Sequence, residues 1–134
     1  VAGTVGAGAR VPLVDAYEKG EGLYHVACPP QLARSSVVAV EVAGDSMEPV
    51  YYPGDVLFFT RDAIGVPDDA IGHNCIVEDA DGMAWVKRLR RGDEPGLFNL
   101  IALNDRAETQ HNVPIRWAAR VRFALPAEDV ERVD

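Results

Sequence analysis

The stretch that decides the fold runs from Val37 to Thr60 and reads VVAVEVAGDSMEPVYYPGDVLFFT. It begins with Val37–Val42, a run rich in β-branched residues that is typical of a buried strand. It ends with a second apolar run, Val56–Thr60, and the tripeptide Pro53-Gly54-Asp55 before that run is typical of a tight turn. Short apolar runs separated by turn residues favour many short β-strands over long helices.

The rest of the chain continues this pattern, with 12 Gly and 9 Pro distributed over 134 residues. Further strands are expected at Val11–Val14, Asn74–Glu78, Met83–Leu89, Leu97–Leu103 and Ile115–Leu125. The Asp81-Gly82 pair between two of these runs is a good hairpin signal. Weak helical segments are expected at Gln31–Ser35 and Pro126–Asp134. The sequence therefore predicts one mainly β domain, built as a curved sheet or a partly closed barrel.

Composition limits the classes of function. The length suits one domain, and a hydrophobic content of 48% is enough to bury a core without metals or disulfides. DNA-binding surfaces are basic, so a formal charge of −8 argues against direct nucleic-acid binding by this domain. No apolar run approaches the roughly twenty residues that a membrane helix needs, so no membrane segment is expected.

The cysteines and histidines carry no sign of a scaffold or a metal site. Cys28 and Cys75 are too few for a disulfide framework and are expected to be reduced, buried thiols in a cytoplasmic protein. His25, His73 and His111 lie far apart and lack metal-ligand spacing, so no metal or other cofactor is expected. The chain has no signal-peptide pattern. Because it begins at valine rather than methionine, we expect sequence upstream of it.

Ser46 is the first candidate for chemistry. It lies in Gly44–Pro49, directly after the Val37–Val42 strand. A turn of small residues at a strand end can hold a hydroxyl in the open, as a nucleophile requires. The same residues are also ordinary turn chemistry, in which Ser46 is inert and Asp45 and Glu48 are turn or capping residues. The turn by itself leaves both interpretations open.

Lys87 is the second candidate, because strand alternation over Met83–Leu89 gives it apolar neighbours. One face would hold Trp85, Lys87 and Leu89, and the other would hold Val86, Arg88 and Arg90 with the arginines in water. Burial lowers the pKa of a lysine, and a neutral lysine can remove the proton of a serine hydroxyl. Alternatively, the ammonium reaches the strand edge and stays solvated. The basic cluster Lys87–Arg91 fits a solvated strand face better than a nucleic-acid site.

Five short blocks of sequence, taken together and in order, carry a family resemblance. They are Gly44–Pro49, Pro53–Val56, Trp85–Leu89, Leu100–Asn104 and Trp117–Val121. In this order they resemble the LexA-like self-cleaving peptidase domain, which the SOS repressor, phage repressors and UmuD-type proteins share. The resemblance extends from about Val5 to Pro126. It implies the curved, partly closed β fold of the LexA–signal peptidase type.

The resemblance also assigns roles to residues around the two candidates. Ser46 matches the family's nucleophile and Lys87 its general base. Gly44 and Met47 belong to the nucleophile turn, where the backbone next to Met47 would help to hold the oxyanion. Ala119 stands where many relatives have glycine. Arg91–Gly96 resembles a subgroup of helix-turn-helix regulators, some of which do not cleave.

The family cleaves its own chain at an Ala-Gly or Cys-Gly bond upstream of the serine. Here Ala7-Gly8 matches that site, and Ala2-Gly3 is a poorer candidate. Small residues would let an extended, tethered segment enter a narrow cleft. The same stretch also fits a flexible approach to the first strand. The expected organisation is a flexible linker over 1–12, the peptidase and dimerisation domain over 13–126, and an acidic tail over 127–134.

The leading hypothesis is the C-terminal regulatory and dimerisation domain of a LexA-like transcriptional regulator. A Ser-Lys autopeptidase would cut its N-terminal linker and separate this homodimer-forming part from an upstream DNA-binding domain. The resemblance also implies a RecA-type co-protease as a partner and a role as a repressor in the SOS response. Two alternatives remain open: a non-cleaving oligomerisation module of a helix-turn-helix regulator, and a UmuD-type polymerase accessory protein.

Overall fold

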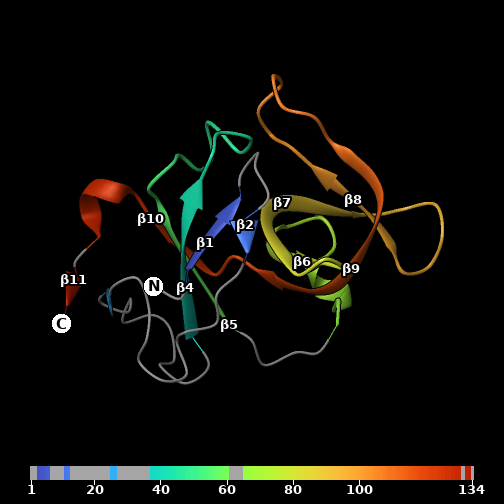
Figure 1. The fold of residues 1–134 in the computed structure, drawn as a ribbon, viewed down its shortest axis with the longest axis horizontal. Helices are drawn as coiled ribbons and strands as arrows, with labels where there is room; N and C mark the ends of the chain where they lie inside the picture. Colours follow the sequence, from blue (N-terminus) through green and yellow to red (C-terminus); the bar gives the residue numbers. More distant parts are fainter. Residues whose placement is uncertain are drawn as a thin grey trace.

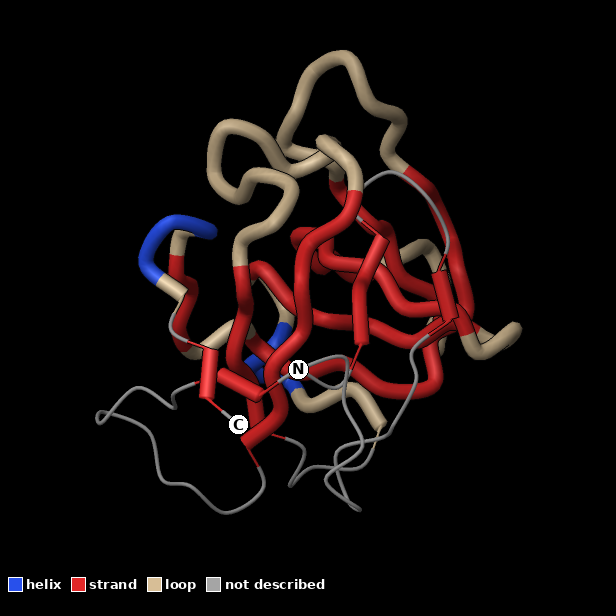
Figure 2. The backbone as a smooth tube through the Cα atoms, turned by 60° about the vertical axis from the view of Figure 1, so that its left-hand side comes forward, coloured by secondary structure: helices blue, strands red, loops and turns tan. Residues whose placement is uncertain are grey.

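The structure is a computed structural model that describes residues 3–6, 11–12, 25–26, 37–60, 65–130 and 132–133. Nearly all regular structure in these residues is β-strand, as Figures 1 and 2 show. The strands are β1 (Gly3–Gly6), β2 (Val11–Pro12), β3 (His25–Val26), β4 (Val37–Ala43), β5 (Val56–Thr60), β6 (Asn74–Asp79), β7 (Met83–Arg91), β8 (Leu97–Ile101), β9 (Gln110–Arg120), β10 (Phe123–Leu125) and β11 (Arg132–Val133). Two single-turn 3₁₀ helices are η2 (Asp68–Ala70) and η3 (Ala127–Asp129).

One half of the main sheet is open. Its strands follow the order β10-β5-β4-β1-β7, on the left of Figure 1. The strand β4 runs antiparallel to β5, and β1 runs parallel to both β4 and β7. A second, two-stranded sheet pairs β11 with β3. The predicted strands at Val37–Val42 and Val56–Thr60 are confirmed and lie side by side in this half.

The other half closes on itself. Strand β7 pairs with β6 and β8, and β9 pairs with both of those strands, so the four form a ring of antiparallel neighbours. The predicted hairpin joins β6 to β7. Its Gly82 has a φ of 81°, which glycine adopts readily, and the Gly82 N–H donates to the Asp79 carbonyl over 3.1 Å. The predicted mainly β fold with a partly closed barrel is confirmed.

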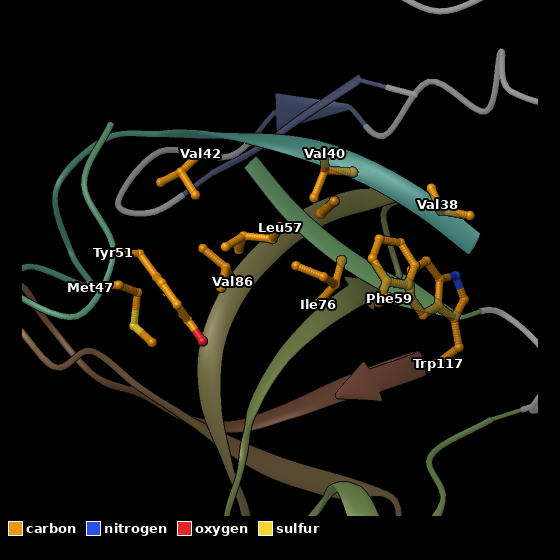
Figure 3. Close-up of a cluster of buried hydrophobic side chains, with 11 residues drawn as sticks. Val38, Val40, Val42, Met47, Tyr51, Leu57, Phe59, Ile76, Val86 and Trp117 are labelled. Carbon is orange, nitrogen blue, oxygen red and sulfur yellow. The ribbon is translucent and has the colours of Figure 1, made fainter. Parts of the chain in front are cut away.

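Two buried clusters lie on the two faces of β7. The first joins the open half to the ring and contains Met47, Tyr51, Val86 and the stacked pair Phe59 and Trp117, whose ring centres are 5.9 Å apart (Figure 3). The second fills the ring. Its members are Ala70, Cys75, Val77, Trp85, Leu89, Phe98, Leu100 and Ala118. The core is therefore continuous across β7, which contributes side chains to both clusters.

This arrangement corrects the expected faces of β7. Val86 was assigned to a face shared with solvated arginines, but it is fully buried in the first cluster. Arg88 is half-buried and its Nε donates to Asn74 Oδ1 over 3.2 Å, whereas Arg90 is exposed. Alternation sorted the faces correctly, since Trp85 and Leu89 do share the second cluster. The alternation of residues along a strand cannot show that other strands cover both of its faces, as they do for β7.

Some predicted boundaries are wrong. Strand β8 ends at Ile101 rather than at Leu103. The strand expected over Ile115–Leu125 is two strands, and β9 already begins at Gln110. Between β9 and β10 the chain passes from β6 to β5. The Arg122 N–H, which lies between the two strands, already donates to the Phe58 carbonyl of β5 over 2.8 Å. The tail contains only η3 and β11 in its described part, and the helix expected at Gln31–Ser35 lies outside the described residues.

In the part of the chain that the structure describes, no helix is long and apolar enough to cross a membrane. The N-terminal stretch expected to be a linker contributes β1 and β2 to the main sheet. The domain boundaries at residues 12 and 126 stay predictions.

Candidate functional site

The nucleophile turn follows directly after β4. Its first residue, Gly44, has a φ of 84°, a left-handed conformation that glycine adopts without strain. Three residues later Met47 is fully buried in the first cluster, and its carbonyl accepts the N–H groups of Val50 and Tyr51 over 2.8 and 3.0 Å. The buried methionine and these backbone bonds turn the chain sharply and fix the side-chain direction of Ser46.

The structure brings Ser46 and Lys87 together. Lys87 lies in the middle of β7, and its Nζ donates a hydrogen bond to Ser46 Oγ over 2.8 Å. Its side chain is only 2% exposed, so the alternative of a solvated ammonium at the strand edge is wrong. The two residues come from separate elements, and the pairing depends on packing the turn against the ring.

The expectation of an open hydroxyl is wrong as well. Ser46 is 0% exposed, because the turn carries it inward beside Met47 rather than outward at the strand end. Buried polar groups need hydrogen-bond partners, and the contact with Lys87 satisfies the Ser46 hydroxyl. The hydroxyl and the amine thus share one site that is closed to bulk water.

Burial lowers the pKa of Lys87 below the ordinary value for a lysine, because removing the amine from water penalises its charged form. The ring of Trp85 lies 5.5 Å from Nζ, and a cation–π contact favours the charged form. Desolvation is the dominant effect. A lysine in this state has a neutral amine at a lower pH than a lysine in water, and a neutral amine can accept a proton.

A hydroxyl within hydrogen-bond reach of a buried amine is a pair of groups that can support nucleophilic chemistry of the Ser-Lys type. A family model described as Peptidase S24-like matches residues 1–122. The chain belongs to the peptidase S24-like family. This is the family of the LexA C-terminal domain and UmuD-type self-cleaving peptidases, as the sequence blocks predicted. A search of curated proteins gives no significant match.

In this peptidase S24-like domain, Asp79 holds the indole of Trp85 next to Lys87. The sequence did not indicate this role. Asp79 Oδ2 accepts the indole N–H of Trp85 over 3.0 Å. Its Oδ1 accepts the backbone N–H groups of Asp81 and Met83 over 2.9 and 3.0 Å. The carboxylate therefore connects the β6–β7 turn to the indole. The aspartate at the start of the Asp-Ala-Asp-Gly turn was a visible signal, but only the fold shows its contact with the tryptophan.

Asn104 is a second residue whose role was missed, although it belongs to one of the family blocks. It follows β8, and its backbone and side chain bond to the turn that carries Ser46. An open pocket of about 510 Å³ lies beside these bonds. It is lined by Asp45, Glu48, Pro49, Leu103, Asn104, Asp105 and Arg106.

The candidate scissile residues Ala7 and Gly8 lie outside the described residues. The strands on either side of them are described. Strand β1 runs parallel to β7 and ends at Gly6, opposite Trp85. Strand β2 starts at Val11, opposite Ala84. The described residues on either side of positions 7–10 therefore pair with Trp85 and Ala84 of β7, two and three positions before Lys87.

Two further kinds of site were considered in the sequence, a metal site and a reactive thiol. They contain no group of three or more His, Cys, Asp or Glu side chains placed to hold a metal ion. Cys75 is a free, buried thiol that donates to the carbonyls of Ala70 and His73 over 3.3 and 3.4 Å, and burial raises its pKa to about 12. Cys28 lies outside the described residues.

Proposed function

We propose that this domain is a serine endopeptidase that cleaves its own chain between Ala7 and Gly8, with Ser46 as nucleophile and Lys87 as general base. The observation that carries the proposal is the 2.8 Å contact between Lys87 Nζ and Ser46 Oγ in a fully buried site. Membership of the peptidase S24-like family supports the same reaction.

The reaction follows from the two groups. Neutral Lys87 takes the proton of Ser46 Oγ, and the oxygen attacks the carbonyl carbon of Ala7 to form a tetrahedral intermediate. The ammonium then returns the proton to the nitrogen of Gly8, the C–N bond breaks, and an ester joins Ala7 to Ser46. A water molecule, deprotonated by Lys87, hydrolyses the ester and restores the hydroxyl.

Burial of the nucleophile supports an intramolecular substrate. Ser46 is 0% exposed, so any scissile bond has to enter the site before it can react, and a free peptide would have to do so from dilute solution. A segment of the same chain that is already tethered to β7 needs no diffusional encounter and gains a high effective concentration. Ala7 and Gly8 are small enough for such a narrow site. These features favour self-cleavage over general proteolysis.

The regulatory role completes the proposal. The domain would form a homodimer in the cytoplasm and hold together two copies of an upstream DNA-binding domain, since a dimer binds two half-sites. Cleavage at Ala7–Gly8 would cut that connection and release repression. The charge of −8 agrees with a division of labour in which this domain does not bind DNA itself. Light scattering that shows only monomers would remove the dimerisation part.

The catalytic part is tested by incubating the chain at mildly alkaline pH and measuring its mass. The wild type is expected to lose residues 1–7, while Ser46→Ala and Lys87→Ala stay intact. Arg90→Ala is the matched control, because this exposed cation lies on the same strand as Lys87 and should leave cleavage unchanged. An intact wild type, or equal fragments from Lys87→Ala, would contradict the proposal.

The pH dependence gives an independent check. Because the reaction needs neutral Lys87, its rate should rise with pH as the amine loses its proton. The lowered pKa of Lys87 places the midpoint below about 10.4, the value of an ordinary lysine. A midpoint at or above that value would show that another group is the base.

A further inference from the structure

The loop after β8 holds the turn that carries Ser46. The backbone N–H of Asn104 donates to the Ser46 carbonyl over 2.8 Å. Its side-chain Nδ2 donates to the carbonyl of the preceding residue, Asp45, over 2.9 Å. One residue therefore binds two successive carbonyls of the nucleophile turn, from 59 positions away in the chain.

The side chain of Asn104 is itself held in place. Its Oδ1 accepts the backbone N–H of Arg106 over 3.1 Å, and its own carbonyl accepts the N–H of Ala107 over 3.0 Å. These two bonds fold residues 104–107 into a compact turn. The amide group is then fixed with its NH₂ end towards Asp45, so both ends of the amide are used.

The remaining bonds of the nucleophile turn are local and do not place it against β7. The Glu48 N–H donates to the Asp45 carbonyl over 3.1 Å, which closes the turn on itself. Within the described part of the chain, the hydrogen bonds that reach residues 45 and 46 from beyond the turn come from Asn104 and from Lys87. The bond from Lys87 is the contact that has to be maintained, so it cannot be counted as a separate restraint on Ser46. Asn104 supplies the restraint that is independent of Lys87.

Packing does not replace this restraint on the outer side of the turn. Asp45 is exposed, and the pocket of about 510 Å³ opens beside it. The turn therefore has room to move outward once its bonds to Asn104 are lost. On the inner side Met47 anchors the chain in the core, so such a movement would be a local rotation about Met47 and not an unfolding of the domain.

We propose that Asn104 is a positioning residue, which keeps Ser46 Oγ within hydrogen-bond reach of Lys87 Nζ by binding the carbonyls of Asp45 and Ser46. This inference rests on the proposed self-cleavage. A displacement of about 1 Å between reacting groups can lower a rate by about 100-fold, and a loss of that size is expected without Asn104's side chain. The Asn104 backbone bond remains in any variant, so the loss should be partial.

The test compares Asn104→Ala with a matched control, Asn99→Ala. Asn99 is also half-buried, and its side chain likewise makes two hydrogen bonds, accepting the N–H of Asn112 over 2.9 Å and donating to the Arg91 carbonyl over 3.4 Å. Neither of these bonds involves the nucleophile turn. Cleavage is measured by mass over a range of pH, at a temperature where circular dichroism shows both variants to be folded.

The expected result is a plateau rate about 100-fold lower for Asn104→Ala, with the pH midpoint of the wild type, and no change for Asn99→Ala. The midpoint should stay because Lys87 keeps its buried surroundings. A midpoint raised towards that of an ordinary lysine would instead mean that water has entered the site, and would overturn the positioning role. Equal plateau rates for the two variants would overturn it as well.

A second measurement does not depend on cleavage. In a Ser46→Ala background, which cannot cleave, amide hydrogen exchange over residues 44–50 should be faster with Asn104→Ala than without it. Asn99→Ala should leave that exchange unchanged. Unchanged exchange with Asn104→Ala would overturn the inference even if the wild type cleaves. A wild type that does not cleave, with faster exchange in the variant, would remove the proposed function but keep Asn104 as the residue that holds the turn.

Discussion

Ser46 and Lys87, the two residues of the proposed dyad, are held in different ways. Lys87 lies on β7, which pairs with β6 along one edge and with β8, β1 and β2 along the other. Ser46 lies in a turn that is held by one buried side chain, Met47, and by the bonds from Asn104. A sheet distributes its restraint over many backbone bonds, whereas the turn depends on a few side chains. Single substitutions should therefore displace Ser46 more easily than Lys87.

Burial shifts the pKa values of two neighbouring groups in the ring of strands in opposite directions. Cys75 on β6 is the register partner of Lys87 on β7, and both are almost fully buried. Burial favours the neutral form of each, so it raises the pKa of Cys75 to about 12 and lowers that of Lys87. The same physical effect favours a neutral amine at Lys87, as the proposed general base requires, and leaves Cys75 with almost no reactive thiolate.

The largest expected effect belongs to the base. Lys87→Met should lower cleavage by about 10²–10⁴-fold, the usual contribution of a general base. In a Ser46→Ala background, where the substitution leaves no buried hydroxyl without its partner, Lys87→Met should raise the free energy of unfolding by about 0.5–2 kcal/mol at neutral pH, because an apolar side chain does not have to lose its hydration. Cleavage is measured by mass and stability by urea unfolding. A destabilised variant would contradict the account of Lys87 as a desolvated amine.

The gain in stability should depend on pH. The folded-state pKa of Lys87 is lower than that of the unfolded chain, which is near 10.4, so the unfolded chain binds more protons between these two values. The stability that the lysine costs is therefore recovered as the pH rises through this range. The advantage of Lys87→Met should shrink in the same range and be largest below it.

The next effect separates the turn from the ring core. Met47→Ala and Leu100→Ala both remove a fully buried side chain, from the first and second cluster respectively, and each should lower the free energy of unfolding by about 2–5 kcal/mol. Cleavage per folded molecule should fall only in Met47→Ala, since Met47 anchors the nucleophile turn. Equal losses of cleavage in the two variants would show that the turn and the ring respond alike.

A smaller effect on cleavage is expected from a substitution of Trp85, whose indole lies beside Lys87. Trp85→Phe keeps an aromatic face but loses the hydrogen bond to Asp79, and phenylalanine is the weaker cation–π partner. The charged form of Lys87 loses some support, so the midpoint of the pH–rate profile should move down by less than about one pH unit. A midpoint that moves up would indicate that water entry outweighs the lost contact.

The smallest effect should be at the thiol. In a Cys28→Ser background, Cys75 of the folded protein should not react with iodoacetamide at pH 8, because its pKa of about 12 leaves almost no thiolate. Labelling is followed by mass, with the urea-unfolded protein as the positive control. Rapid labelling of the folded chain would show that the ring of strands opens readily. The strands around Lys87 would then be no more rigid than the turn that carries Ser46.

Much of the fold was accessible from local patterns. The strands at Val37–Val42 and Val56–Thr60 and the hairpin at Asp81-Gly82 follow from side-chain shape and turn chemistry, which act over a few residues. The strand start predicted at Ile115 is wrong, since β9 begins at Gln110 and includes Pro114, a residue that is unusual inside a strand. Pairing partners of β9 decide that extension, and they are distant in sequence.

The site divides in the same way. Ser46 and Lys87 were accessible as candidates, because a serine in a turn and a lysine at an apolar strand position are visible in the sequence. The supports were not accessible. Asp79 accepts a hydrogen bond from the Trp85 indole, six residues away, and Asn104 donates one to the Asp45 carbonyl, 59 residues away. No spacing rule predicts such contacts.

The sequence by itself indicated most of the strands and made Ser46 and Lys87 candidates for the chemistry, since these depend on residue type, short-range spacing and the order of the family's sequence blocks. Only the tertiary structure decided that both faces of β7 are buried, that Ser46 is enclosed rather than open, and that its hydroxyl meets Lys87 at 2.8 Å. Closing the ring removes water from the amine, and loss of water lowers its pKa. That desolvation arises from packing elements far apart in the chain.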